Sequence, residues 1–476
     1  MYAKFLLTFQ RKRAEIRREI FNFRDLESLK KFSEVTEGLD KFQHCFTGNK
    51  TPEEISNKFF KTLDDIFPQC FQKIRIKSKP SPVQNIDEIG EMIKLKADLK
   101  MFLETSKCKL GLEMAKRKLE KVEEDIAENI ADRNAKVIQE QVKVLDTTDG
   151  KFSQLGLWKV KNKICPRPRD PPTAKRDKFG NLITAPSTLR TLYLDTYKSR
   201  LEHRKIEPEF EDLQELKTVL WNLRFTNLKQ KKSKEWTTSD LDKVISSLKN
   251  NQSRDPKGMI NELFKKGVSG SGLKLGVVQL MNTIKLSFFL PNYMQYSDIS
   301  SIFKLKGSRL DLSSDRGIFN LAVLRKILDK LIYLDKYQAL HISMSDSNIG
   351  ARKNKNVRNH LFIVYRVINN VISGGKDCID IQIYDLVQAF DALWLEDCMN
   401  DLYDALPENK RDDKLALVYQ TNVRNLVAVN TSVGQTERVN MPKIVQQGGA
   451  WGPMECSVSI DKIVKLCTKS GEHLYK

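Results

Sequence analysis

The segment CIDIQIYDLVQAFDALW, residues 378–394, changes its hydrophobic period halfway along. In its first half every second residue is isoleucine, and this alternation predicts a half-buried β-strand. From Val387 onward apolar residues recur at three- and four-residue steps, which predicts one face of a helix. The sequence therefore predicts a strand that runs directly into a helix, with Asp385 at the junction.

The position of Asp385 has two interpretations. Aspartate is among the commonest helix N-caps, so this residue can simply begin the helix. A carboxylate at the end of a strand can also face a metal ion or a phosphate. Alternation places Asp385 on the isoleucine side of the strand, so the pattern by itself leaves both interpretations open.

The residues that follow Asp385 resemble a known motif. Four residues later comes Ala389-Phe390-Asp391, an arrangement similar to motif A of reverse transcriptases in the form found in non-LTR (LINE-type) retrotransposons. The resemblance covers about half of the chain, from Asp240 onward, through several separate motifs in the expected order. It implies an α+β fold, in which a helical N-terminal region precedes the fingers and part of the palm of a right-hand polymerase.

Two segments upstream of motif A resemble the fingers. In residues 251–264, NQSRDPKGMINELF, the Pro-Lys-Gly sequence predicts a turn, and the helix after it is expected to bring Glu262 and Phe264 inward. The second comprises residues 299–307 and 314–318, and the resemblance implies that these two stretches pair as a hairpin.

The resemblance implies that Lys304 and Arg316 of this hairpin hold the triphosphate of the incoming nucleotide. Lysine supplies a compact charge and arginine a planar fork that can bind two phosphate oxygens. Without the family, exposed basic residues on a hairpin would indicate only solubility.

A further segment, residues 345–354, SDSNIGARKN, resembles the retroelement motif that precedes the palm. The resemblance implies that Gly350, Arg352 and Lys353 contact the template strand. The helix predicted over residues 357–371 then leads into the strand of motif A.

Residues 444–453, IVQQGGAWGP, are similar to motif B and follow a hairpin predicted over residues 426–439. In the family the Gln-Gly pair begins a helix under the templating base pair, which implies that role for Gln447 and Gly448. Glycine suits this position because bases and sugars pass close to the backbone. The segment departs from the family where Gln446 replaces arginine and where AWG replaces Pro-Leu-Ser.

In the intact family the reaction is RNA-templated DNA synthesis with Mg²⁺ as the cofactor. The resemblance implies that Asp385 binds the metal ions, with the backbone carbonyl of Leu386 as an added ligand. It also implies that Phe390 lies under the deoxyribose and excludes a 2′-hydroxyl by its bulk. Helical spacing would bury Phe390 in a core in any case, so both interpretations of this residue stay open. Asp391 is interpreted as a first-turn helix charge.

Two metal ions need three carboxylates, and the family takes two of them from a Tyr-x-Asp-Asp motif that this sequence lacks. The Asp-Asp pairs present are Asp64-Asp65, in a predicted helix, and Asp412-Asp413, before motif B. We therefore expect a truncated reverse transcriptase, without motif C and the thumb, that does not polymerise by itself.

The composition suits a polyanionic partner. The 81 Lys and Arg residues exceed the 61 Asp and Glu residues, which gives a net charge of +20. The expected partners are an RNA template, a DNA primer and deoxynucleoside triphosphates. Eight scattered cysteines indicate reduced thiols, and neither a secretory signal nor an apolar run of membrane-spanning length is visible. These features predict an intracellular protein, in the nucleus or in a cytoplasmic ribonucleoprotein, without a membrane partner.

Three regions follow from the patterning. Residues 1–145 are expected to be helical, with the longest helix over residues 86–145, and this region forms either a helical hairpin or bundle or a surface for self-association. Residues 146–235 are expected to form a basic linker that contains several prolines, followed by a helix. Residues 236–476 are expected to contain the fingers and partial palm.

A rival hypothesis belongs to another class. The protein would then be a non-catalytic nucleic-acid-binding or scaffold protein derived from a retroelement. It would use its helical N-terminal third for partners and its basic half for RNA.

Overall fold

The computed structural model describes residues 18–38, 40–76, 88–105, 111–125, 174–202, 208–266, 271–304, 307–374, 390, 393–441, 445–446 and 448–469. The chain forms two compact units. Unit 1 comprises Met1–Arg18 and Arg75–Asp170, and unit 2 comprises Glu19–Ile74 and Pro171–Lys476. The described residues are mostly helical and include a small mixed sheet, so the predicted α+β character is confirmed at this level.

Unit 1 contains helix α4 (Glu88–Thr105) and helical residues 111–125. The Nζ atoms of Lys96 and Lys100 lie 2.9 and 3.0 Å from the Glu123 carboxylate. In one continuous helix a separation of 27 residues would span about 40 Å. The chain therefore turns back on itself between these residues, and the prediction of a single helix over residues 86–145 is wrong.

Unit 2 begins with the short strand pair β1 (Arg18–Phe21) and β2 (Lys73–Ile76) and the helices between them. These are α1 (Leu26–Glu37), α2 (Asp40–Phe46) and α3 (Pro52–Cys70). Helix α3 begins at Pro52, because Thr51 caps it in a capping box with Glu54 and proline occupies its first turn. The three helices pack against α11 (Ser271–Ser287), where Gly276 leaves room for the rings of Phe42 and Phe59.

The five-stranded sheet of unit 2 has the order β6-β5-β7-β8, with β9 also paired to β7. Strands β5 (Tyr296–Phe303) and β6 (Asp315–Leu321) are antiparallel, whereas β5 and β7 (Leu426–Thr431) are parallel. The outer edge of β7 pairs with β8 (Gly434–Gln435) and β9 (Val439–Asn440). Both predicted hairpins, β5–β6 and β7–β8, are confirmed.

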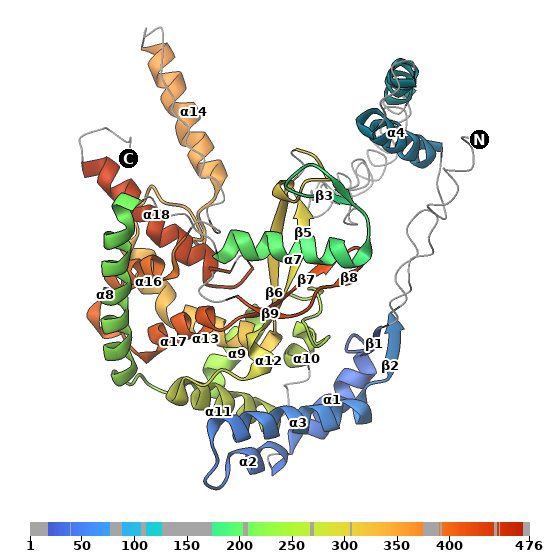
Figure 1. Cartoon of the computed structure of the whole chain (residues 1–476). Helices are drawn as coiled ribbons and strands as arrows, with labels where there is room; N and C mark the ends of the chain where they lie inside the picture. The colour runs from blue at the N-terminus through green and yellow to red at the C-terminus, as the bar shows by residue number, and fades with distance from the viewer. Residues whose placement is uncertain are drawn as a thin grey trace, which may run out of the picture. The chain divides into compact units, whose positions relative to one another are not determined.

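Helix α7 (Pro186–Glu202) packs on this sheet, and its buried residues form a second, smaller core with it (Figure 1). A two-stranded hairpin of β3 (Lys175–Arg176) and β4 (Leu182–Ile183) precedes α7. Tyr197 of α7 fits against Gly317 of β6, where a Cβ atom would lie 2.6 Å from the tyrosine ring. The chain around residues 175–202 thus belongs to the sheet structure.

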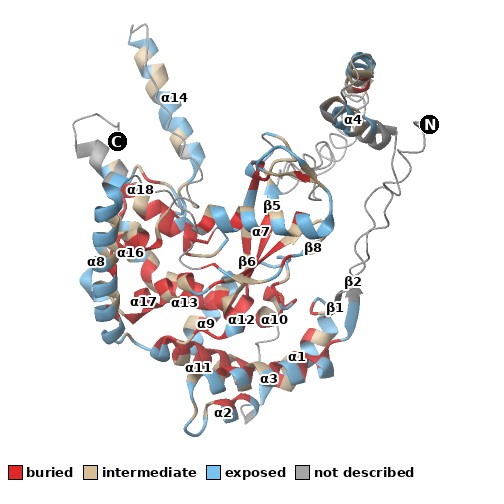
Figure 2. Cartoon of the chain, viewed as in Figure 1, coloured by how far each residue is buried: buried red, intermediate tan, exposed pale blue. Residues whose placement is uncertain are grey.

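The larger core lies among the other helices of unit 2, and α1, α2, α3 and α11 contribute to it. Figure 2 shows the buried residues concentrated on the sheet and on the inner sides of these helices. The remaining elements are η2 (Pro208–Phe210), α8 (Glu211–Gln230), α9 (Thr238–Ser247), α10 (Asn261–Lys266), α12 (Asn292–Gln295), η3 (Leu312–Ser314), α13 (Val323–Ser343), α14 (Val357–Ser373), α16 (Leu395–Ala405), η4 (Glu408–Lys410), α17 (Asp413–Val423) and α18 (Gly452–Lys469).

Local sequence explains where several of these helices begin. Thr237 caps α9 in a capping box with Asp240, as the Trp-Thr-Thr-Ser-Asp sequence predicts. The predicted helix over residues 357–371 is confirmed as α14, which extends away from the rest of unit 2 with many exposed apolar residues (Figure 1).

Among the described residues, no helix is both long enough and apolar enough to cross a bilayer. Four cysteines, Cys45, Cys70, Cys398 and Cys456, are buried free thiols.

Candidate functional site

Three of the predicted site residues, Asp385, Leu386 and Gln447, lie outside the described residues, as does the strand predicted over residues 378–384. The roles implied for them therefore stay predictions. Phe390 is described and half-buried, and its ring packs against the larger core of unit 2.

The β5–β6 hairpin carries the two basic residues expected at the triphosphate. Lys304 follows β5, and Arg316 on β6 is the register partner of Ile302. The backbone N–H of Lys304 donates to the Ser314 carbonyl at 2.8 Å, and its Nζ donates to the Ser313 carbonyl at 3.1 Å. Both side chains are exposed at one end of the hairpin, where an anion can reach two cations.

A buried ion pair fixes this end of the hairpin. The Nζ of Lys175 lies 2.7 Å from Oδ2 of Asp315, and neither side chain is more than 4% exposed. The same oxygen accepts the hydroxyl of Ser301 at 2.7 Å, and Ser301 in turn accepts the hydroxyl of Tyr197 at 2.9 Å. Burial lowers the pKa of Lys175, although its hydrogen bond to Asp315 acts in the opposite direction. Sequence reasoning missed this pair because 140 residues separate its members.

The loop that contains Gly448 lies against β6. Gly448 has a φ of +129°, and a Cβ atom there would clash with the carbonyl oxygen of Phe319. Gly448 is therefore required by its backbone conformation and by this close approach to β6. Two segments that resemble separate motifs of the family, around Arg316 and Gly448, thus meet in space. Helix α18, which follows the loop, begins at Gly452.

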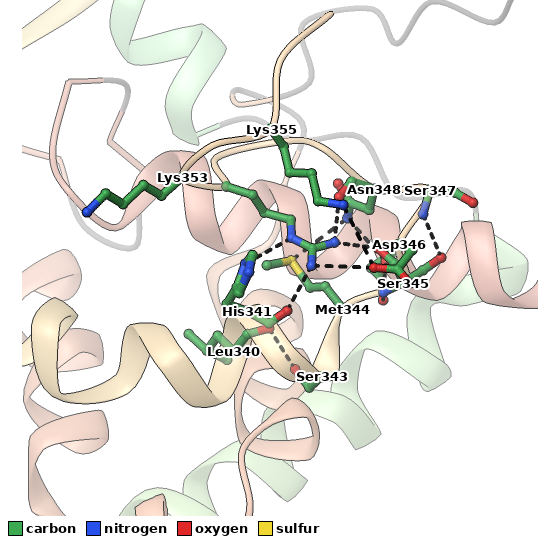
Figure 3. Close-up of polar contacts among 12 residues, drawn as sticks. Leu340, His341, Ser343, Met344, Ser345, Asp346, Ser347, Asn348, Lys353 and Lys355 are labelled. Carbon is green, nitrogen blue, oxygen red and sulfur yellow. Dashed lines mark hydrogen bonds and ion pairs between the residues drawn. The ribbon is translucent and has the colours of Figure 1, made fainter. Parts of the chain in front are cut away.

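The segment predicted to contact template forms a tight turn after α13, and Figure 3 shows Ser345, Asn348 and Lys353 of this turn. The guanidinium of Arg352 donates hydrogen bonds within it. Arg352 is buried, and it donates to the Nδ1 and carbonyl of His341, to the carbonyl of Ser345 and to that of Asn348, at 2.6–3.1 Å. The guanidinium therefore holds the turn together. Lys353 is exposed, and its backbone N–H donates to the hydroxyl of Tyr337 at 2.6 Å.

The same turn is attached to α18. The Nδ2 of Asn348 donates to the Ser457 carbonyl at 2.8 Å and to Asp461 at 3.2 Å. The hydroxyl of Ser457 donates to the Gly350 carbonyl at 2.7 Å, and a Cβ atom on Gly350 would lie 2.7 Å from that hydroxyl oxygen. The turn and α18 therefore form one structure, although more than 100 residues separate them. The template contact implied for Gly350, Arg352 and Lys353 stays a prediction.

The predicted turn at residues 255–258 is confirmed and is organised by Asp255. Its buried carboxylate accepts the backbone N–H groups of Lys257, Met259 and Val323 at 2.8–3.1 Å, together with the hydroxyl of Tyr293. Burial raises the pKa of Asp255, and these hydrogen bonds act against that rise. The carboxylate thereby ties the turn to the start of α13.

A second buried acid, Glu455, lies on α18. It accepts the amide of Asn422 at 2.8 Å and lies close to the buried pair of Arg325 and Asp329, whose atoms are 2.9 Å apart. Burial, and then the negative charge of Asp329, raise the pKa of Glu455 to about 8. Sequence reasoning missed this residue. The available signal was a single acid on the apolar face of a helix, between Met454 and Val458.

The acidic residues of the described chain do not form a two-metal centre. No three His, Cys, Asp or Glu side chains within the described ranges lie close enough together to hold a metal ion. Asp412 caps α17 and binds the Nζ of Lys336 at 2.6 Å, and Asp413 is buried and accepts the Ser233 N–H at 3.2 Å. Both members of this Asp-Asp pair thus have structural roles, and metal binding by Asp385 stays a prediction.

None of the known protein-family profiles matches this chain. No curated protein matches its sequence.

Proposed function

We propose that this chain is a reverse-transcriptase-like domain of a non-LTR retroelement that binds an RNA template, a DNA primer and a deoxynucleoside triphosphate. The observation that carries the proposal is the contact between the Gly448 loop and β6, the strand that bears Arg316. Two segments that resemble separate polymerase motifs, more than 100 residues apart, thus lie against each other on the strand that bears the exposed Arg316. The net charge of +20 supports a nucleic-acid partner.

On this proposal the exposed end of the β5–β6 hairpin receives the triphosphate. Lys304 would act as a point charge, and Arg316 would bind two oxygens through its planar fork. The Lys175–Asp315 pair positions the start of β6 and so keeps Arg316 in place. The turn around Arg352 would present the exposed Lys353 to the phosphates of the template.

The test measures the affinity of the chain for a labelled duplex of RNA template and DNA primer. Fluorescence anisotropy gives this affinity with and without the matching deoxynucleoside triphosphate. We expect the nucleotide to tighten the complex, and Lys304→Ala/Arg316→Ala to reduce this gain by about tenfold or more, because each charge-assisted hydrogen bond is worth about 1.5–3 kcal/mol. Lys116→Ala/Lys118→Ala removes two exposed charges from unit 1 and serves as the matched control. An affinity for the duplex that is the same with and without the nucleotide would contradict the proposal.

Primer extension with Mg²⁺ separates a polymerase from the rival scaffold protein. We expect this 476-residue chain not to extend the primer, because its sequence supplies one of the three carboxylates that the reaction needs. Incorporation that disappears in Asp385→Ala would show that the chain is an active polymerase. Salt-dependent RNA binding that is indifferent to the nucleotide would favour the scaffold protein.

A further inference from the structure

A basic hollow lies between the loop that follows α8 and the segment that begins α17. Its volume is about 380 Å³, and a second hollow of about 460 Å³ shares Lys234, Asp335, Lys410 and Lys414 with it. Volumes of this size are typical of small-molecule sites, at roughly 300–1,000 Å³. These residues are distinct from those of the β5–β6 hairpin.

The charges that line the first hollow are mainly positive. Six Lys and Arg side chains face three carboxylates, and those carboxylates already have partners. Asp335 lies 3.0 Å from Lys336, 3.2 Å from Lys410 and 3.8 Å from Lys414. Burial acts to raise the pKa of Asp335, but these lysines outweigh it and the pKa is lowered. One carboxylate is thus shared by three ammonium groups.

Two exposed lysines of the loop, Lys232 and Lys234, have no acidic partner within the described part of the chain. Between them, Ser233 has a buried hydroxyl oxygen for which the described residues provide no hydrogen-bond partner. An anion in the hollow would neutralise both lysines.

The site is held in shape before any ligand arrives. Asn282 makes two hydrogen bonds of 3.0 Å to the backbone of Trp236, and the buried Nζ of Lys285 donates to the Ser233 and Lys234 carbonyls at 2.9 and 3.2 Å. On the opposite wall, Arg411 donates to the Leu406 carbonyl at 2.8 Å and lies over the ring of Tyr403. A rigid arrangement of cations costs little reorganisation on binding.

We propose that this hollow, formed by Lys232, Ser233, Lys234, Lys410, Arg411 and Lys414, binds a compact polyphosphate group. An open basin with cations on opposite walls suits a ligand whose charges are concentrated in a small volume. An extended nucleic-acid strand places its phosphates in a row and would contact one wall only.

The test is isothermal titration calorimetry of the full chain with inorganic triphosphate, without divalent cations and at about 0.15 M salt. All proteins in this test carry Lys304→Ala/Arg316→Ala, so that binding at the β5–β6 hairpin does not contribute. The result therefore does not depend on whether the function proposed above is correct. We expect Lys232→Gln/Lys234→Gln to weaken binding by about tenfold or more, since each charge-assisted bond lost is worth over 1 kcal/mol.

The matched control is Lys116→Gln/Lys118→Gln, which removes the same charge from exposed positions in unit 1 and should leave the affinity within about twofold. Thermal unfolding of each variant confirms that these surface changes leave the fold intact. The proposal is overturned by an unchanged affinity in Lys232→Gln/Lys234→Gln, or by equal binding of sulfate at the same ionic strength. Displacement of the triphosphate by a short RNA with a 5′-hydroxyl end, at an equal concentration of phosphate groups, would overturn the preference for a compact ligand.

Discussion

The carboxyl group of Glu455 has a pKa of about 8 because it is buried beside Asp329, whose charge opposes ionisation. In the unfolded chain the same group ionises near pH 4.5. Between these two values the folded protein holds a proton that the unfolded chain has lost. This residue therefore makes the folded state less stable as the pH rises through that range.

We predict that the free energy of unfolding of Glu455→Gln falls less between pH 5 and pH 8 than that of the unchanged protein. The difference in slope should reach about 1.4 kcal/mol per pH unit at most, because one proton is involved. Glutamine keeps an oxygen that can accept the Asn422 amide and removes the titration. Urea unfolding at several pH values measures the effect, with the exposed Glu437→Gln as the control. Parallel stability curves for Glu455→Gln and the unchanged protein would contradict the prediction.

At the scale of secondary-structure elements, much of the structure follows from neighbouring residues. Thr51 and Thr237 begin helices as the sequence predicts, because an N-cap depends on residues three positions apart. The β5–β6 pairing could be predicted only through the family resemblance. The ion pair that fixes it could not, since Lys175 comes from a segment interpreted as a basic linker and meets Asp315 across 140 residues.

We predict that Lys175→Met destabilises unit 2 by about 3–5 kcal/mol, because it leaves the Asp315 carboxylate buried without a cation. Chemical denaturation followed by tryptophan fluorescence measures this change. The exposed Lys178→Met, in the same β3–β4 hairpin, removes an equal charge and should cost less than about 0.5 kcal/mol. Equal destabilisation by the two substitutions would show that the buried pair does not fix the hairpin.

At the scale of the whole molecule, neither of the two units is a single continuous segment of the sequence. Unit 2 takes its first helices from Glu19–Ile74 and the rest from Pro171 onward, so the longer segment of unit 1, Arg75–Asp170, is inserted into the sequence of unit 2. The sequence gives no local sign of this, because α3 packs on α11 through residues more than 200 positions apart, such as Phe59 and Gly276. The boundaries predicted at residues 145 and 235 stay predictions.

We predict that unit 2 folds when residues 77–170 are replaced by a flexible Gly/Ser linker, because the described cores of unit 2 need no residue from that segment. The shortened chain should show a single cooperative thermal transition within about 5 °C of the transition that the full chain shows for this unit. Circular dichroism and calorimetry provide the measurement. A chain that lacks a cooperative transition would show that unit 1 is required for folding.

The parallel pairing of β5 with β7 affects the order of events during synthesis. Tyr296 pairs with Leu426, so Leu426 is translated 130 residues after its partner. At about 5–20 residues per second this takes roughly 7–26 seconds, and for most of that time one edge of the nascent β5–β6 hairpin is open to other chains. Crowded polysomes and fast induction should therefore lower the yield of native protein, and slower translation at reduced temperature should restore it.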